Sequence, residues 1–191
     1  MGVDRLGHIE AMNSKIERLL ELDAVEVMEQ RWDEDYAERY NDSRLALDHP
    51  TELSGDYPGD LAALFALTNR PRFGSVEIRS ESNFRETKVV DSLGEPIDDR
   101  ARIRIGDVGE DAILLDKASG AVMIYNYTYF KWGWSTGTVL ECADVPEFVD
   151  TVALGPRYRE ILGPLARVKA WWREDPWFEF LVEIGMADQP F

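Results

Sequence analysis

The chain has 191 residues, 45% of them hydrophobic and 30% charged, which is the composition of an ordinary globular domain. Its 37 acidic residues against 21 basic ones give a formal net charge of −16, and the resulting field repels nucleic acid and attracts basic partners. Cys142 is the only cysteine, so an internal disulfide is excluded, and no apolar run reaches the roughly 20 residues needed to span a membrane. The N-terminus lacks the apolar core of a secretory signal, so we expect a cytoplasmic protein without direct contacts to nucleic acid or membrane.

The negative charge lies mainly in the two flanks of the chain. Residues 1–60 hold 16 acidic and 6 basic side chains, residues 61–140 hold 11 and 10, and residues 141–191 hold 10 and 5. Such flanks either solvate surface helices or steer a basic partner onto the molecule.

Helical periodicity marks the N-terminal segment. Between residues 4 and 30, apolar residues recur at spacings of three and four, which predicts one or two helices with Asp4 as the N-cap. Trp32, Tyr36 and Tyr40 continue this spacing and place three aromatic rings on one helix face, either for packing on the core or for a partner.

A loop rich in Pro, Gly and Asp spans residues 48–60 and is the best candidate for a domain boundary. We expect an N-terminal helical arm over residues 1–50. An α+β domain with a helical C-terminal tail then covers residues 51–191.

Period-two alternation indicates the strands of the middle segment, and turns rich in Gly and Asp separate them. A short helix follows Pro58 and ends near Asn69. Residues 106–111 and 116–120 form turns, and Gly120 supplies a positive φ to the second one. The expected strands, in chain order, are Ser75–Arg79, Glu86–Val90, Ala101–Ile105, Ala112–Leu115 and Ala121–Phe130.

Helical signals return after the strands. Asp144, with Glu147 three residues later, forms a variant of the capping box. A last helix begins after Asp175-Pro176 and ends at Gly185. The order helices, strands, helices predicts an α+β fold with a mainly antiparallel central sheet flanked by N- and C-terminal helices.

The sequence contains no pattern typical of a catalytic or cofactor site. His8 and His49 are the only histidines and lack metal-ligand spacing, and Cys142 has no local signature of a nucleophile. The glycines of residues 106–109 lack the third glycine and the long helix of a dinucleotide loop. We therefore expect no metal, no cofactor and no enzymatic activity.

Four acids crowd the two turns of the middle segment, namely Asp107, Glu110, Asp111 and Asp116. A calcium loop does not fit them, because Gly109 stands where a ligand is needed and the last loop position is not acidic. These acids either form turns or, where two carboxylates converge, supply the acid and base of a glycoside-type hydrolysis.

An excess of aromatic residues follows the second turn. If the last strand continues, Tyr125, Tyr127 and Tyr129 share one of its faces. The opposite parity carries Phe130, Trp132 and Trp134. Either the C-terminal helices cover these rings, or Trp132 and Trp134 are exposed and anchor a partner. In the covered arrangement the tryptophans opposite the sheet are Trp171, Trp172 and Trp177.

The central run resembles the SUKH superfamily. The similar features are the strand–Gly-Asp–strand pattern IRIGDVGEDAILLD, the turn from Asp116 to Gly120, the strand AVMIYNY and the helix DVPEFVDTV, which resembles the family's closing aspartate-hydrophobic-x-x-Phe helix. Upstream, LAALFALTNRPRFGSVEIRS resembles the family's helix, Asn turn and following strand. The resemblance covers residues 57–155, with Tyr57-Pro58 in place of the usual Leu-Pro start.

The resemblance implies an α+β fold without established catalytic residues. Bacterial members of the superfamily are immunity proteins that bind and neutralise toxins, often nucleases or deaminases, and fungal members are scaffold or signalling proteins. We therefore expect a non-enzymatic immunity protein whose partner is a basic toxin domain, with an intracellular scaffold as the alternative and a carboxylate-based hydrolase as the weakest hypothesis. The residues expected to contact the partner are Asp107, Glu110, Asp111, Tyr127, Tyr129, Trp132 and Trp134.

Overall fold

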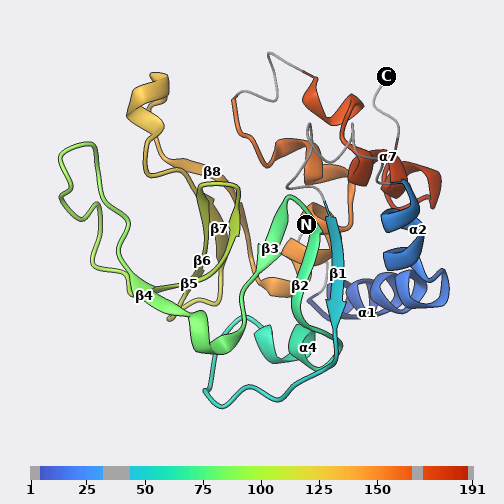
Figure 1. The fold of residues 1–191 in the computed structure, drawn as a ribbon. Coiled ribbons are helices and arrows are strands. Elements are labelled where there is room, and N and C mark those ends of the chain that lie inside the picture. Colours follow the sequence, from blue (N-terminus) through green and yellow to red (C-terminus); the bar gives the residue numbers. More distant parts are fainter. Residues whose placement is uncertain (1–4, 32–43, 165–169, 189–191) are drawn as a thin grey trace.

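The computed structural model describes residues 5–31, 44–164 and 170–188, and these form an α+β fold (Figure 1). An antiparallel sheet of eight strands occupies the centre and left of the view, and helices from both ends of the chain gather to its right. The predicted fold class and the antiparallel sheet are thereby confirmed.

The strands follow the order β1-β2-β3-β5-β6-β7-β8 across the sheet, and β4 pairs with β5 off this path. Chain neighbours are therefore mostly sheet neighbours. The strand bounds are β1 (Arg44–Asp48), β2 (Asn69–Gly74), β3 (Val76–Ile78), β4 (Arg85–Thr87), β5 (Arg102–Val108), β6 (Asp111–Asp116), β7 (Val122–Tyr125) and β8 (Thr138–Cys142).

The helices are mostly short. Asp144 accepts a hydrogen bond from the Glu147 N–H at 2.9 Å, so the predicted N-cap is confirmed. Asp175 accepts one from the Phe178 N–H at 2.9 Å and caps the last helix, which begins where it was predicted. The α-helices are α1 (Arg5–Glu21), α2 (Ala24–Arg31), α4 (Leu61–Phe65), α5 (Val145–Glu147) and α7 (Pro176–Glu183). The other helical segments are the π-helix η3 (Phe148–Ala153) and the 3₁₀ helices η1 (Glu81–Asn83), η2 (Tyr129–Trp132), η4 (Pro156–Glu160) and η5 (Trp171–Arg173).

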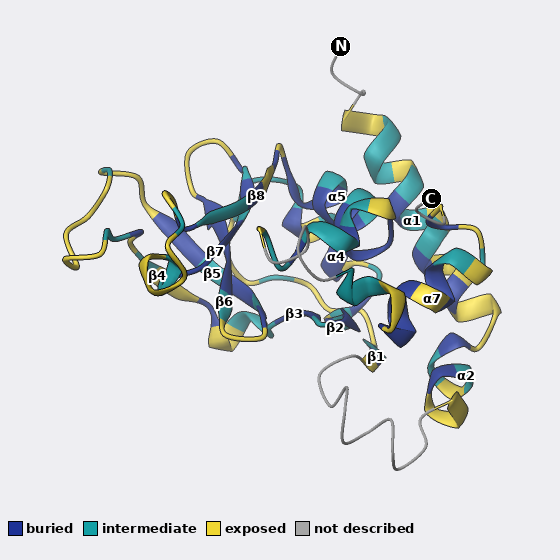
Figure 2. Cartoon of the chain, turned by 90° about the horizontal axis from the view of Figure 1, so that it is seen from above, coloured by how far each residue is buried: buried dark blue, intermediate teal, exposed yellow. Residues whose placement is uncertain are grey.

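One face of the sheet packs against the helices and forms the main core. Alternation along the strands directs Ile105 and Ile113 to this face, where they join buried residues from α1, α4, η3 and α7. Figure 2 shows that the strands are largely buried, whereas the loops at the end of the sheet remote from the helices are exposed. The opposite face carries a smaller apolar cluster of Val89, Ala112, Leu114 and Tyr125.

Strand β5 organises the sheet, because three strands pair with it. A Cβ atom at Gly106 would lie 2.2 Å from the carbonyl oxygen of Glu77, so only glycine allows β3 to approach β5 this closely. The pairing with β6 shifts by a bulge between Arg104 and Gly106. β4 pairs with residues 102–104 of β5, before the bulge, and β3 pairs with residues 106–108, after it. Residues 79–84, which connect β3 to β4, therefore leave the sheet.

The turn between β5 and β6 is shorter than predicted. Val108 pairs with Asp111, so the turn consists of Gly109 and Glu110, and Gly109 has a φ of 57°. The prediction of residues 106–111 as a turn was wrong because the first glycine allows close strand packing and does not reverse the chain. By contrast, the turn after β6 is confirmed, and Gly120 there has a φ of 78°.

Strand β7 ends at Tyr125, whereas the sequence predicted a strand as far as Phe130. The side chain of Asn126 accepts a hydrogen bond from the Thr128 N–H at 2.8 Å, and this local turn redirects the chain into η2. β8 follows this excursion as a strand that the sequence analysis did not predict.

The N-terminal segment includes a strand as well as helices. β1 lies inside the expected helical arm and pairs antiparallel with β2, which begins where a helix was expected to end. The helical prediction fails there because strand pairing is a long-range interaction that residues 44–48 do not reveal alone. Asp4, Trp32, Tyr36 and Tyr40 lie outside the described residues.

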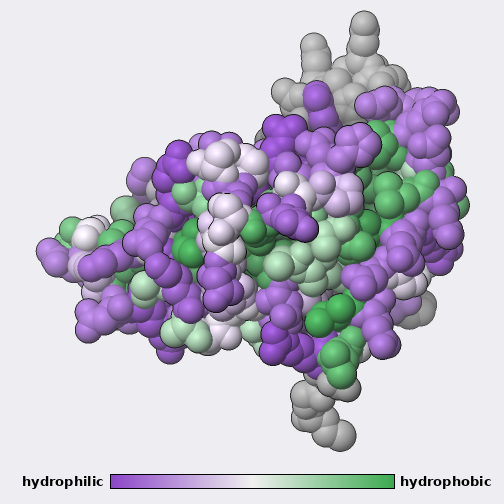
Figure 3. All heavy atoms as spheres, turned by 90° about the horizontal axis from the view of Figure 1, so that it is seen from below, coloured by the Kyte–Doolittle hydropathy of each residue, from purple (hydrophilic) through white to green (hydrophobic). Residues whose placement is uncertain are grey.

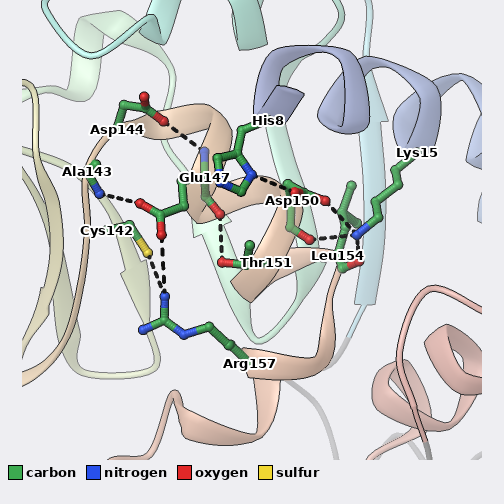
Figure 4. A network of polar contacts seen from close by, with 10 residues as sticks. All are labelled: His8, Lys15, Cys142, Ala143, Asp144, Glu147, Asp150, Thr151, Leu154 and Arg157. Atoms are coloured by element: carbon green, nitrogen blue, oxygen red, sulfur yellow. Dashed lines mark hydrogen bonds and ion pairs between the residues drawn. The ribbon is translucent and has the colours of Figure 1, made fainter. Parts of the chain in front are cut away.

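Helix α1 is attached to the main core by apolar packing and by an ionic contact (Figure 4). Its fully buried side chains are Met12, Ile16 and Leu19. Asp150 of η3 lies 2.8 Å from His8 Nδ1 and 2.7 Å from Lys15 Nζ. Lys15 also donates to the backbone carbonyls of Asp150 and Leu154, so α1 and η3 are joined at several atoms.

Replacing Gly106 by Ala is expected to destabilise the protein by about 2 to 4 kcal/mol, because the added methyl group overlaps the Glu77 carbonyl and separates β3 from β5. Gly7→Ala is the matched control, since no atom lies within 4 Å of its added Cβ in α1. This control should be neutral or stabilising by up to about 1 kcal/mol. Denaturant unfolding measures both, and equal effects would contradict the role of Gly106.

Asp150→Asn keeps the size of the side chain and removes the negative charge that interacts with His8 and Lys15 of α1. We expect a loss of about 2 to 3 kcal/mol and faster amide exchange within residues 5–21, because Lys15 then lacks its counter-charge in a largely buried place. Asp48→Asn breaks an exposed pair with Arg70 and should cost less than about 1 kcal/mol. If the two variants lose the same stability, the ionic contact does not fasten α1.

Candidate functional site

The β5–β6 turn and the segment after β7 lie at the same end of the sheet. Val108 pairs with Asp111, and Ala112 pairs with Tyr125, the last residue of β7. The turn residue Glu110 therefore stands near the chain that leaves β7.

Three tyrosines cluster where β7 ends. The ring of Tyr125 lies 5.0 Å from that of Tyr127 and 6.4 Å from that of Tyr129, edge to face in both cases. Tyr129 also meets Phe130, with ring centroids 5.8 Å apart. The tyrosines are neighbours, as expected. The sequence predicted that alternation along one strand would bring them together, whereas in the structure a turn and η2 do so.

The tyrosine hydroxyl groups hold the loop of residues 88–98 against the sheet. Tyr125 donates to the carbonyl of Val90 at 2.9 Å, and Tyr127 donates to the carbonyl of Lys88 at 3.2 Å. The loop closes on itself through a bridge between Val90 and Pro96. These bonds define its position relative to η2, although the loop tip extends into solvent.

Apolar side chains project from this loop and from η2 into solvent. Leu93 is 84% exposed and Ile97 is 52% exposed, while Trp132 is 58% and Phe130 is 43% exposed. Figure 1 shows the loop at the far left of the molecule and η2 above it. We call this surface the aromatic end, which consists of Leu93, Ile97, Glu110, Asp111, Tyr127, Tyr129, Phe130 and Trp132.

Acidic groups occupy the β5–β6 turn, at the end of the sheet where the chain leaves β7. Glu110 is exposed at the tip of the turn, and Asp111 is partly buried next to it. Burial raises the pKa of Asp111 to about 6, the charge of Glu110 adds to the rise, and Arg104 opposes it. Asp111 therefore gains its negative charge around pH 6, next to the exposed side chain of Glu110.

Two of the seven expected contact residues point elsewhere. The carboxylate of Asp107 lies between two arginines, 2.5 Å from Arg79 Nε and 2.8 Å from Arg104 Nε. Trp134 is half-buried, with its ring close to Gly163. The other five are members of the aromatic end. Leu93, Ile97 and Phe130 were not among the residues predicted to contact a partner.

One hypothesis from the sequence expected the C-terminal tryptophans to cover the tyrosines. They do not cover them. Trp177 is fully buried in the main core, with its ring 6.4 Å from that of Phe73. The tyrosines belong to the opposite face of the sheet, where Tyr125 contributes to the smaller cluster. Trp171 and Trp172 also pack against the main core, so the two aromatic groups lie on opposite faces of the sheet.

Two further candidates from the sequence, Asp116 and Cys142, are engaged in the fold. Asp116 accepts hydrogen bonds at 2.9 Å from the N–H groups of Ala118 and Ser119, as a turn-forming aspartate does. Burial raises the pKa of the Cys142 thiol to about 12, which disfavours the reactive thiolate. Among the described residues, no group of three or more His, Cys, Asp or Glu side chains is placed to hold a metal ion.

A cavity opens between residues 50–55 and α4, and few charged or polar side chains line it. It measures about 560 Å³, and its lining from residues 50–55 and α4 includes a single charged side chain, Glu52. Figure 3, which views the molecule from below, shows hydrophobic residues grouped toward the middle of this side among hydrophilic ones. The cavity lies away from the aromatic end.

No protein-family model matches the sequence, and no match is found among curated proteins or solved structures. In the described ranges of the chain, no helix combines the length and apolar character needed to cross a bilayer.

Asp111→Asn should stabilise the protein in a pH-dependent manner. With a pKa of about 6 in the folded chain, against an ordinary value of about 3.9, Asp111 binds its proton more tightly when folded. Its ionisation therefore opposes folding increasingly between about pH 4 and pH 6, and fully above that range. The asparagine variant should gain up to about 3 kcal/mol at pH 8 and nothing near pH 3. A gain that is equal at both pH values in denaturant titrations would contradict this environment for Asp111.

Proposed function

We propose that this chain is a non-enzymatic cytoplasmic binding protein, of the immunity type found in the SUKH superfamily. Its partner is a basic toxin domain, of nuclease or deaminase type, which it neutralises by covering the toxin's functional surface. The observation that carries the proposal is the aromatic end, where apolar side chains of the loop and of η2 are exposed to solvent and the β5–β6 turn adds acidic groups at the same end of the sheet as the chain leaving β7.

Long-range attraction is the first contribution to such binding. The chain has a net charge of −16, and a field of this sign accelerates the approach of a positively charged partner. Glu110 lies exposed at the tip of its turn and places part of that charge at the end of the sheet where the chain leaves β7. This contribution weakens as salt screens the charges.

Short-range anchoring is the second contribution. Trp132 and Phe130 are large side chains of which about half remains in solvent, 58% and 43% respectively. Tryptophan and tyrosine are favoured among the residues that dominate binding energies at protein interfaces. Their burial against the toxin would remove apolar surface from water on both molecules.

Preorganisation is the third contribution. The hydroxyl groups of Tyr125 and Tyr127 fix the loop base at the carbonyls of Val90 and Lys88. Because the loop and η2 rest on the same tyrosine cluster, little ordering remains to be done on binding, which favours affinity. Three of the expected contact residues, Tyr127, Tyr129 and Trp132, belong to this preorganised surface.

The alternative function is an intracellular scaffold that uses the same surface for a different protein. Gene neighbourhood separates the two hypotheses, because an immunity gene is expected beside the gene of its toxin. A carboxylate-based hydrolase has less support, since Asp107 is engaged by two arginines and Asp116 is used in a turn.

The proposal is tested by co-expressing the chain with the product of the adjacent gene and measuring growth and complex formation. We expect growth to be rescued and the complex to weaken with salt. Trp132→Ala should lower affinity by about 30-fold or more, and Glu110→Lys should slow association.

Leu20→Ala and Glu17→Lys are matched controls, because both residues are exposed on α1 away from the aromatic end. Neither control should change affinity. Absence of both rescue and complex would overturn the proposed function. A complex that is indifferent to Trp132→Ala and Glu110→Lys would overturn the assignment of the surface.

A further inference from the structure

A second site lies on the outer face of the sheet, where residues 79–84 leave it between β3 and β4. A cavity of about 310 Å³ opens there, within the usual range for small-molecule sites. Its lining residues are Glu77, Arg79, Asn83 and Arg85. It differs from the aromatic end in charge, because arginines dominate its lining in a chain that is otherwise strongly acidic.

Strand register brings two positive charges together beside this cavity. Arg85 of β4 is directly opposite Arg104 of β5 in the antiparallel pairing. Side chains at such positions are cross-strand neighbours on one face, and like charges placed there repel each other. Arg104 and Arg79 share the carboxylate of Asp107, and Arg104 also interacts with the charge of Asp111, whereas Arg85 has no ion-pair partner among the described residues.

The arginines are held in place yet retain free N–H groups. Arg85 Nη1 donates to the carbonyls of Ser82 at 2.8 Å and Phe84 at 2.7 Å, which orients the guanidinium. Arg79 uses Nε for Asp107. Within the described part of the chain, Nε and Nη2 of Arg85 and both Nη atoms of Arg79 have no hydrogen-bond partner. A planar pair of N–H donors is well suited to the oxygens of a phosphate group.

Acceptors complete the lining. Asn83 donates through Nδ2 to Ser80 Oγ at 3.0 Å, which leaves its carbonyl oxygen able to accept. Glu77 is half-exposed at the rim, 3.8 Å from Arg72, and also accepts hydrogen bonds. A bare anion would gain nothing from these two groups, whereas a ligand with hydroxyl groups beside its phosphate would.

We propose that this cavity binds a small hydroxylated phosphate monoester. Arg79 and Arg85 bind the phosphate oxygens, and Asn83 and Glu77 accept hydrogen bonds from neighbouring hydroxyl groups. The bound phosphate offsets the repulsion between Arg85 and Arg104. This site is independent of the aromatic end and of the proposed toxin partner, because it uses different residues and the opposite charge.

The proposal is tested by backbone amide NMR titration of the full chain with glycerol phosphate and with inorganic phosphate, each against sodium chloride at equal ionic strength. We expect saturable shifts at residues 77–86 with both phosphates and tighter binding of glycerol phosphate. Arg85→Gln should weaken binding about tenfold or more, because a charge-assisted contact is lost. Arg79→Gln should do the same.

Arg100→Gln is the matched control, since Arg100 is 62% exposed and lies outside the cavity. It should leave both affinities unchanged. Among the described residues, Arg85 makes side-chain hydrogen bonds only to the carbonyls of Ser82 and Phe84, so its variant is expected to fold, and the NMR spectrum verifies this directly. No phosphate-specific shift, or equal weakening by Arg85→Gln and Arg100→Gln, would overturn the site. Tighter binding of inorganic phosphate than of glycerol phosphate would overturn the monoester assignment.

Discussion

The close approach of Glu77 to Gly106 is the constraint on which most of this structure depends. A side chain at position 106 would collide with the Glu77 carbonyl at 2.2 Å, so this glycine decides that β3 can pair with β5. Because β4 uses the remaining length of the same edge of β5, residues 79–84 have to leave the sheet between them. The arginine-lined cavity arises at that exit. The same strand continues into the turn that carries Glu110 to the aromatic end.

The two faces of the sheet have different roles as a result. One is filled by helices from both ends of the chain, and Asp150 ties α1 to it through His8 and Lys15. The other keeps only a small apolar cluster around Tyr125, and its remaining surface carries arginines, acids and tyrosines. Both proposed binding sites use this second face and its loops. Packing of the first face supplies the rigidity, and the incomplete cover of the second leaves side chains available to ligands.

Features encoded by local interactions were predictable from the sequence, and features that depend on distant contacts were not. The helices before residue 32, the caps at Asp144 and Asp175 and the turn at Gly120 follow from spacing and from hydrogen bonds within a few residues. β1 and β8 escaped prediction because their partners lie elsewhere in the chain. Gly106 was predicted as a turn residue because the sequence does not distinguish a glycine needed for close strand packing from one needed for a turn. At the candidate site, Trp132 was identified by its residue type. Leu93 and Ile97 were missed because their exposure depends on a loop that distant tyrosines hold in place.

The aromatic end is the proposed contact surface for a protein partner. Hydrogen–deuterium exchange of the chain, measured alone and with the product of the adjacent gene, tests it most directly. Protection concentrated in residues 91–98, 109–111 and 127–132 is the result expected, with the helices of the opposite face unchanged. Protection confined to α1, α2 or the cavity beside α4, with none at the aromatic end, would contradict it.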